Sequence, residues 1–226
     1  MGCDFSPATL LTAYRNGIFP WPHGETTDEI AVDRLTEPLV LWFSPNPRTV
    51  FPLEEPLHWS RSLRRTLRNH PYEVTFDADF PQVMRMCGET RAPSTWIIPP
   101  LVAGYEKLHE LGWTHSVEVW ETAPGADKET APGAGKETEP SRVLVGGIYG
   151  IAIGGMFAGE SMFHLRTDAS KIAFATLAER LRGAGFVLFD VQVQNPHLES
   201  LGCVEISRTE YLTRLRAALP IQARLI

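Results

Sequence analysis

The chain of 226 residues has little that would mark a secreted, membrane-spanning or metal-binding protein. It has only three cysteines, Cys3, Cys87 and Cys203, and their wide separation gives neither a metal-ligand spacing nor a disulfide framework. No apolar run approaches the ~20 residues that a membrane span needs. The first ten residues lack the basic and apolar regions of a secretory signal. We therefore expect a protein of the reducing cytoplasm, with no metal, no cofactor and no membrane contact.

An excess of positive charge is also missing. The 21 Lys and Arg residues face 27 Asp and Glu residues, for a formal net charge of -6. A protein that coats nucleic acid without specificity is basic, so any such contact here needs a local patch. The predicted helix 58–69 supplies one, because its arginines recur at three- and four-residue spacing on one face: Arg61, Arg64, Arg65 and Arg68. A solvated helix face is the alternative, but the lack of any acidic neighbour in this stretch favours phosphate contact.

One segment stands apart by composition. An eight-residue unit, ETAPGADK and then ETAPGAGK, starts at residue 121 and breaks off at residue 140. It holds no large apolar side chain, so its burial cannot offset the entropy cost of ordering it. The flanking segments 116–120 and 143–145 have strand-like patterns. We predict a long hairpin whose tip, residues 121–142, is a low-complexity loop outside the catalytic machinery.

The remaining pattern predicts an α/β (α+β) fold. Helices are predicted over 7–14, 80–87, 99–111 and 168–182, and strands over 143–149, 151–157 and 186–193. The order of strands, helix and strand after the loop is typical of a mixed α/β layer. We divide the chain into an N-terminal domain, residues 1–70, that carries the basic helix, and a C-terminal domain, residues 71–226.

Three polar side chains lie in apolar or glycine-rich surroundings and are candidates for chemistry. Asp190 and Gln192 share one face of the predicted strand 186–193 and need partners there. They either hold the Asn195-Pro196 turn, or the carboxylate is positioned to orient a neighbouring amide or a substrate amine. Glu160 follows a glycine-rich turn, where it is either a surface residue at a hairpin end or part of an anionic pocket for a cationic group.

Other motifs of catalysis are absent. The chain has no G-x-S-x-G elbow, no H-E-x-x-H pair and no P-loop lysine, which argues against a serine hydrolase, a zinc protease and a nucleotide triphosphatase. We interpret His109 and His115 as core or surface histidines. The early aromatic residues, Tyr14 and Trp21 among them, together with Trp96, form either core or a pocket for an apolar side chain or a nucleobase.

Taken together, these stretches resemble the bacterial leucyl/phenylalanyl-tRNA–protein transferases, and the matching segments follow the family's order over nearly the whole chain. They are A-Y-R-N-G-I-F-P-W (13–21), W-F-S-P-N-P-R (42–48), S-T-W-I (94–97), L-H-E-L-G-W-T-H-S-V-E-V-W (108–120), L-V-G-G-I-Y-G-I-A-I-G (144–154), F-A-G-E-S-M-F (157–163), D-A-S-K (168–171), F-D-V-Q (189–192) and H-L-E-S-L-G (197–202).

The resemblance implies an activity and a fold. Such an enzyme takes Leu or Phe, and less readily Met, from aminoacyl-tRNA and joins it to the α-amino group of a protein that begins with Arg or Lys. The product is then passed to the N-degron proteolytic machinery. The family's fold has a small N-terminal α/β domain and a C-terminal domain similar to the N-acetyltransferases. We expect a monomer.

The resemblance also implies roles for particular residues. Asp190 and Gln192 match the family's D-x-Q pair, in which Asp is thought to polarise the Gln that positions the attacking amine. Glu160 is suited to hold the acceptor's cationic N-terminal residue or amine. The aromatic residues Tyr14, Trp21 and Trp96 match positions near the terminal adenosine of the tRNA and the pocket rim. The residues that match the apolar side-chain pocket are Ile148, Phe157 and Leu177, and the arginine helix matches the acceptor-stem cluster.

Two other functions compete with this interpretation. A CoA-dependent N-acyltransferase of related fold would need an R/Q-x-x-G-x-G/A pyrophosphate loop, of which residues 182–185 give only a fragment. A non-catalytic tRNA-binding module would not depend on Asp190 or Glu160. Transfer of labelled Leu from tRNA to a peptide that begins with Arg tests the transferase, and saturable acetyl-CoA binding in calorimetry would support the N-acyltransferase.

Overall fold

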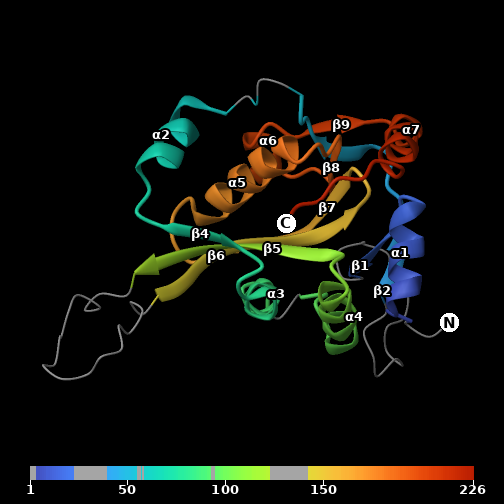
Figure 1. The fold of residues 1–226 in the computed structure, drawn as a ribbon, viewed down its shortest axis with the longest axis horizontal. Coiled ribbons are helices and arrows are strands. Elements are labelled where there is room, and N and C mark those ends of the chain that lie inside the picture. The colour runs from blue at the N-terminus through green and yellow to red at the C-terminus, as the bar shows by residue number, and fades with distance from the viewer. Residues whose placement is uncertain (1–3, 23–39, 55–56, 58, 93–94, 123–141) are drawn as a thin grey trace, which may run out of the picture.

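A seven-stranded mixed sheet forms the centre of the fold in this computed structural model, which describes residues 4–22, 40–54, 57, 59–92, 95–122 and 142–226 (Figure 1). Its strands lie in the order β4-β5-β6-β7-β8-β3-β9. Their bounds are β3 (Arg48–Phe51), β4 (Glu73–Phe76), β5 (Thr114–Thr122), β6 (Arg142–Ile153), β7 (Met156–His164), β8 (Leu188–Gln192) and β9 (Val204–Ile206). A separate two-stranded sheet pairs β1 (Phe19–Pro22) with β2 (Val40–Phe43).

Helices cover both faces of the large sheet. They are α1 (Pro7–Arg15), α2 (Arg61–Asn69), α3 (Phe80–Glu89), α4 (Pro99–Glu110), α5 (Ala169–Gly183), α6 (Pro196–Ser200) and α7 (Arg208–Ala218). In Figure 1, α5 and α6 lie over one face with α2 beside them, and α3 and α4 lie under the other. The α/β fold class predicted from the sequence is therefore confirmed.

Each face of the sheet has its own hydrophobic core. One buried cluster joins the sheet to α1, α3, α4 and α7, through residues such as Leu10, Phe80, Leu101 and Tyr211. The second joins it to α5, α6 and α2, through residues such as Phe174, Leu198 and Leu63. The sheet thus separates two apolar layers, and a side chain on any strand faces one layer or the other.

Side-chain caps explain where the predicted helices begin. The Ser6 side chain accepts a hydrogen bond from the backbone N–H of Thr9 at the start of α1, and Pro7 fits its first turn. The basic helix α2 begins at Arg61 rather than at residue 58, because the Ser60 side chain caps it by accepting from the N–H of Leu63.

The segment predicted as two strands, 143–149 and 151–157, folds differently. Strand β6 continues through Gly150 to Ile153, and the chain turns at Gly154, whose φ of +61° is left-handed. Gly150 instead permits close packing, since a Cβ there would lie 2.2 Å from the carbonyl oxygen of Ala158 and 2.4 Å from the Phe157 ring. The glycine marks a bulge in the β6–β7 ladder and not a turn.

The hairpin predicted around the repeat has the expected flanks. Strands β5 and β6 are antiparallel, and Glu121 and Thr122 pair with Val143 and Arg142 at the hairpin end. The repeat itself, over 123–141, lies outside the described residues. The division of the chain at residue 70 remains a prediction. In the structure, β3 pairs with β8 and β9 inside the large sheet.

None of the helices among the described residues is both long and apolar enough to cross a bilayer.

The close approach of β6 to α5 gives a stability prediction. A Cβ at Gly146 would lie 2.5 Å from the Cβ of Ala169 and 2.9 Å from its carbonyl carbon. Gly146→Ala should therefore lower the free energy of unfolding by about 1–3 kcal/mol in a urea titration, because strand or helix must shift. Gly183→Ala is the control, since no neighbour lies within 4 Å of the added Cβ. Equal stability of the two variants would contradict this account of the packing.

Candidate active site

The candidate site lies where two parallel strands separate. Strands β7 and β8 pair only from Met156 and Leu188 to Ala158 and Asp190. Beyond that point β7 continues to His164 along β6, while β8 remains paired with β3. Glu160 on β7 and Gln192 on β8 both lie just past the last paired residues, and the Gln192 Nε2 donates to Glu160 Oε1 at 3.3 Å. Two of the predicted catalytic residues therefore meet across this gap.

Asp190 is fully buried and surrounded by donors. Arg48 on β3 donates from Nε to Oδ1 at 2.8 Å and from Nη2 to Oδ2 at 2.6 Å. The Tyr211 hydroxyl donates to Oδ2 at 2.9 Å, and the backbone N–H of Gln192 donates to Oδ1 at 3.0 Å. Among the described residues, Asp190 contacts Gln192 through this backbone group and not through the side-chain amide. The carboxylate therefore fixes the chain at Gln192.

Arg48 stays charged in this buried setting. Burial is the largest single influence and lowers the pKa of Arg48, but Asp190, Tyr211 and Glu160 together outweigh it, so the pKa of Arg48 is raised overall. The guanidinium lies between two rings, 4.5 Å from the Phe19 centroid and 4.4 Å from that of Tyr211. Cation–π contact and a bidentate ion pair together stabilise a charge that has lost its water.

Gln192 ends β8 in an unusual backbone conformation. Its φ is +63°, in the left-handed region, which costs a residue other than glycine on the order of 1–2 kcal/mol. The bond from its N–H to Asp190 helps to hold this conformation. Gln192 is only 5% exposed, and its side-chain amide is hydrogen-bonded to Glu160. Among the described residues no donor reaches its amide oxygen, which leaves that oxygen free to accept from a substrate.

Glu160 lies at the end of a chain of hydroxyl groups. The Tyr105 hydroxyl on α4 donates to Glu160 Oε2 at 3.0 Å, and the hydroxyls of Tyr14 and Tyr105 are hydrogen-bonded to each other. Burial raises the pKa of Glu160 to about 7, and the charge of Asp190 adds to this, whereas the two tyrosines and Arg48 oppose it. Glu160 is therefore the carboxyl group here that can gain or lose a proton near neutral pH.

The three residues predicted to line the apolar pocket belong to the same hydrophobic core. Ile148, Phe157 and Leu177 are each at most 2% exposed and belong to the core cluster on the α5 side of the sheet. Gly159 borders this cluster, since a Cβ there would lie 3.2 Å from the Phe189 ring. The three residues therefore belong to the core on the α5 face, whereas Tyr105 and Tyr14, the hydroxyl groups linked to Glu160, belong to the core on the opposite face.

The predicted aromatic residues differ in position. Tyr14 is buried beside Tyr105 and belongs to the hydroxyl chain that ends at Glu160. Trp21 is 36% exposed on β1 and packs edge-on against Phe19, whose ring contacts Arg48. Trp96 is half-buried against the α3–α4 core. The structure thus joins Tyr14 directly to the site and connects Trp21 to it through Phe19.

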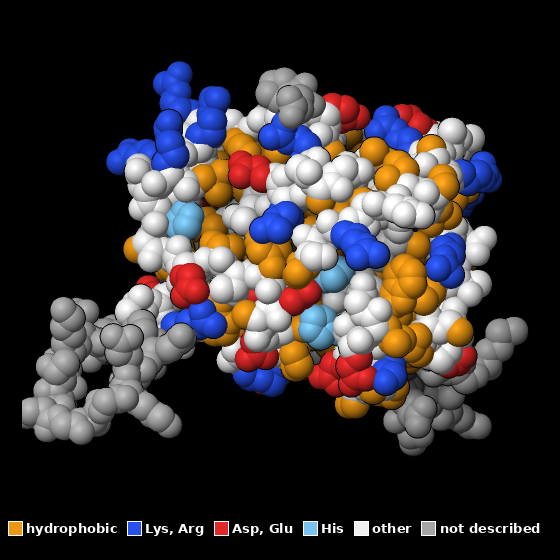
Figure 2. Space-filling model, in the orientation of Figure 1, with side chains coloured by type: hydrophobic (Ala, Val, Ile, Leu, Met, Phe, Trp, Pro, Cys, Tyr) orange, Lys and Arg blue, Asp and Glu red, His pale blue; other side chains and the backbone are white. Residues whose placement is uncertain are grey.

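The predicted phosphate-binding helix carries four exposed arginines. Figure 2 shows Lys and Arg side chains gathered over α2. All four, Arg61, Arg64, Arg65 and Arg68, are exposed, and none forms an ion pair with another described side chain. Leu63 attaches the opposite face of the helix to the core. These arginines are therefore available to an anionic partner.

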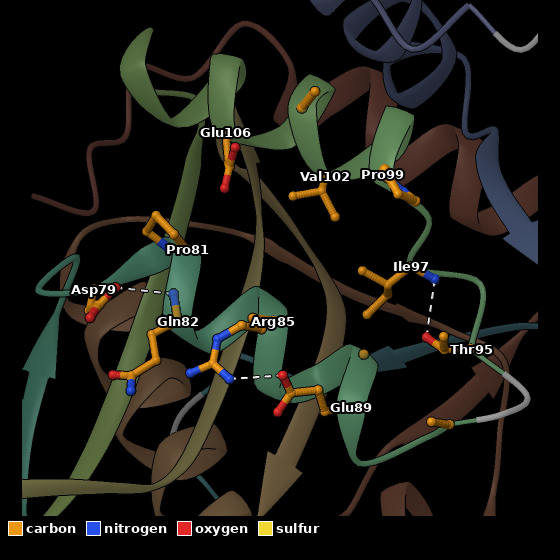
Figure 3. A pocket seen from close by; sticks show the side chains of 13 residues that line it. Asp79, Pro81, Gln82, Arg85, Glu89, Thr95, Ile97, Pro99, Val102 and Glu106 are labelled. Atoms are coloured by element: carbon orange, nitrogen blue, oxygen red, sulfur yellow. Dashed lines mark hydrogen bonds and ion pairs between the residues drawn. The ribbon is translucent and has the colours of Figure 1, made fainter.

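An open groove lies elsewhere, between α3 and α4 (Figure 3). Its volume is about 860 Å³, and its wall mixes apolar residues such as Ile97 and Val102 with carboxylates such as Glu106. Its Arg85 is already paired with Glu89 at 2.8 Å. None of the predicted catalytic, pocket or phosphate-binding residues lines this groove, so it is separate from the candidate site.

Sequence reasoning missed three members of the site: Arg48, Tyr105 and Tyr211. Arg48 lies in the quoted segment 42–48, but its partner Asp190 is 142 residues away, and no periodicity joins them. Tyr105 and Tyr211 lie on the buried faces of α4 and α7, where an aromatic residue is indistinguishable from ordinary core. A buried arginine in a short apolar strand was the one available signal, since such a charge needs a partner.

Comparison with known protein families identifies relatives over most of the chain. The family model described as leucyl/phenylalanyl-tRNA protein transferase matches residues 50–126 and 134–216. The model for the N-terminal domain of the same transferases matches residues 4–31. The first match omits residues 127–133, which fall within the repeat, and this agrees with an added loop.

Curated relatives with the name leucyl/phenylalanyl-tRNA–protein transferase align over nearly the full length. The one from Syntrophobacter fumaroxidans is 44% identical over 97% of this chain and 82% of its own length. The one from Azotobacter vinelandii is 45% identical over 93% of this chain and 80% of its own. The one from Pseudomonas fluorescens is 43% identical over 100% of this chain and 86% of its own.

Among solved structures, the crystal structure of FemX has a similar fold. The TM-score is 0.51 at 13% sequence identity, and the match covers 72% of this chain and 60% of that chain. At this identity the likeness concerns the fold alone.

The raised pKa of Glu160 predicts a pH-dependent cost to stability. The ordinary pKa is 4.5 and the folded value about 7, so between these values the unfolded chain loses the proton that the folded chain keeps. The folded state therefore loses stability as pH rises through this window. Glu160→Gln removes the effect, so its unfolding free energy relative to wild type should increase between pH 5 and pH 8, by on the order of 2 kcal/mol.

Urea titrations at both pH values measure this difference. Glu89→Gln, at an exposed carboxylate of α3, is the control and should show a constant offset from wild type. A constant offset for Glu160→Gln as well would contradict the assigned burial effect.

Proposed function

The chain belongs to the leucyl/phenylalanyl-tRNA protein transferase family, and on this premise we propose that it moves Leu, Phe or Met from aminoacyl-tRNA to proteins that begin with Arg or Lys. It is an enzyme, an aminoacyltransferase. The observation that carries the finer proposal is the contact of Gln192 with Glu160 at the gap between β7 and β8. The carboxyl group of Glu160 has a pKa near neutrality, and the amide of Gln192 is held by a hydrogen bond beside it. This pair of groups suits an incoming amine.

The reaction needs orientation and one proton acceptor. The α-amino nitrogen attacks the ester carbonyl carbon of the aminoacyl-tRNA, a C–N bond forms, and the C–O bond to the ribose breaks. The nitrogen gives up a proton, and the ribose oxygen leaves as a hydroxyl after taking one. The ester is already reactive, so holding amine and ester together in the correct geometry supplies much of the catalysis.

Gln192 serves in this proposal as the residue that positions the amine. Its Nε2 is held by Glu160, which directs the amide oxygen into the gap. That oxygen accepts an N–H of the attacking amine and aligns the nitrogen lone pair with the ester carbon. An amide is too weak a base to remove the proton, so its contribution is geometric.

Glu160 serves as the proton acceptor and as the anionic side of the acceptor site. With a pKa of about 7, the carboxylate is largely ionised at slightly alkaline pH and can take a proton from an ammonium group. The tyrosine hydroxyls of Tyr105 and Tyr14 hold its orientation. A cationic N-terminal residue of the acceptor is favoured next to such a group.

The aminoacyl side chain is proposed to enter the apolar cluster of Ile148, Phe157 and Leu177. An apolar pocket distinguishes one methylene by only about 1–3 kcal/mol. Leu, Phe and Met are therefore accepted together, whereas polar side chains lose their water without gaining partners. The aromatic residues Trp21 and Trp96 would stack on the terminal adenosine of the tRNA.

The wider setting follows from the substrates. We propose that the enzyme works as a monomer in the cytoplasm, where charged tRNA is found, and that its products are degraded by N-degron proteolysis. The curated relatives carry the name leucyl/phenylalanyl-tRNA–protein transferase, which argues against the alternative of a CoA-dependent N-acyltransferase.

A transfer assay tests the proposal directly. The purified chain is mixed with radiolabelled Leu-, Phe- or Met-tRNA and with a peptide that begins with Arg or Lys. Label should enter the peptide, and should not enter the same peptide with its α-amino group acetylated. No transfer, when a related transferase succeeds with the same reagents, would refute the proposal.

Variants of the two proposed catalytic residues should lose turnover. Glu160→Gln removes the proton acceptor and Gln192→Ala removes the positioning oxygen, so each should lower kcat by about 100-fold, within the usual range for such groups. KM for aminoacyl-tRNA should change little, since neither residue contacts the tRNA body. The control Glu89→Gln should keep full activity. Wild-type kcat in either site variant would contradict the assigned roles.

The arginine helix should control the salt dependence of tRNA binding. Arg65→Ala removes one phosphate contact, so the slope of log affinity against log salt should become shallower by about 0.7–0.9. Arg85→Ala, on a helix of the opposite face, is the control and should leave the slope unchanged. Filter binding over 50–300 mM salt, a range chosen about physiological ionic strength, measures both. An unchanged slope for Arg65→Ala would place the tRNA elsewhere.

A further inference from the structure

Arg48 is the largest fully buried side chain of the described residues and lies in the short strand β3. Its exposure is 1%, and each of its three guanidinium nitrogens has a hydrogen-bond partner. Nε and Nη2 bind the two oxygens of Asp190, Nη1 donates to the carbonyl oxygen of Gly17 at 3.1 Å, and Nη2 also lies 3.4 Å from the Tyr211 hydroxyl. A buried cation with this many fixed contacts is held in one orientation.

These contacts bring four segments of the chain together. Gly17 follows α1, which carries Tyr14, and Phe19 opens β1 and packs over the guanidinium. Asp190 belongs to β8, and Tyr211 comes from α7. Arg48 therefore joins the α1–β1 segment, which carries Tyr14, to strand β8, which carries Gln192.

The path from Arg48 to the reacting groups is short. Arg48 and Tyr211 fix the Asp190 carboxylate, and Asp190 Oδ1 accepts the backbone N–H of Gln192 at 3.0 Å. That bond opposes relaxation of the left-handed φ of Gln192 toward ordinary strand geometry. A relaxed Gln192 would turn its side chain, and the amide would lose its contact with Glu160.

We propose that Arg48, with Tyr211, is a positioning residue for the transfer reaction, which holds Asp190 and through it the backbone and amide of Gln192 in the orientation that the attacking amine needs. Asp190 itself is thereby an anchor for Gln192, since its contacts are occupied by Arg48, Tyr211 and a backbone N–H. This inference rests on the proposed transfer function.

Kinetics of Arg48→Lys test the proposal. Lysine keeps the charge but cannot form the two parallel bonds to a carboxylate, so the anchor loosens. We expect kcat to fall at least 10-fold while KM for aminoacyl-tRNA changes less than 3-fold. Arg180→Lys is the control, because Arg180 also lies over an aromatic ring, Phe76, but outside the site; it should retain wild-type kcat.

A double-mutant cycle separates positioning from a merely structural role. If Arg48 acts through Gln192, adding Arg48→Lys to Gln192→Ala should lower kcat by less than 2-fold further, because the amide it positions is already gone. Independent losses that multiply would overturn the proposal, as would a wild-type kcat in Arg48→Lys.

Tyr211→Phe provides a second variant with a smaller disturbance, in case Arg48→Lys fails to fold. It removes one hydroxyl from the Asp190 carboxylate and should lower kcat about 3-fold, again without further effect in the Gln192→Ala background. An unchanged kcat here overturns the proposal. Absence of transfer by the wild-type chain would instead refute the proposed function, so the two failures are distinguishable.

Discussion

The parallel pairing of β7 with β8 extends over three residue pairs and then stops, and this early separation organises the site. Both strands remain fixed on their outer sides, β7 by β6 and β8 by β3, so the gap between them is held open by two ladders. A parallel pair also requires a crossover, and α5 provides it while its apolar side chains fill the core on one face of the sheet. Glu160 and Gln192 approach each other because their strands diverge at a fixed place.

The two carboxyl groups near the separation of β7 and β8, Asp190 and Glu160, have different surroundings and therefore suit different roles. Asp190 faces a guanidinium, a hydroxyl and a backbone N–H, so its oxygens are occupied. Glu160 has fewer donors, and burial raises its pKa to about 7. Environments that differ in this way assign different roles to two chemically similar groups. The geometry therefore favours Glu160 for proton transfer and Asp190 for anchoring, although the family resemblance implied that Asp190 polarises the Gln192 amide.

Local signals in the sequence predicted much of the fold. Capping serines, proline in first turns and apolar spacing placed the helices to within a few residues, and the flanks of the repeat indicated the β5–β6 hairpin. Two polar residues in an apolar strand predicted a need for partners, and Asp190 and Gln192 are buried and hydrogen-bonded in the structure. Gly150 was misinterpreted because a glycine required for close packing against Phe157 has the same local pattern as one required for a turn.

The rest of the site depends on contacts between distant segments, which local patterns do not encode. Arg48 and Asp190 are 142 residues apart, and Tyr14 and Tyr105 are 91 apart. Such a buried ion pair contributes little net stability, because desolvation offsets most of the attraction, while loss of one partner leaves a buried charge at a cost of about 3–5 kcal/mol. A gain in stability therefore does not explain why Arg48 and Tyr211 converge on one carboxylate. The ion pair instead fixes the relative positions of α1, β3, β8 and α7 beside Gln192, the last residue of β8. In the proposed reaction, the incoming amine meets the Gln192 amide in the orientation that these contacts hold.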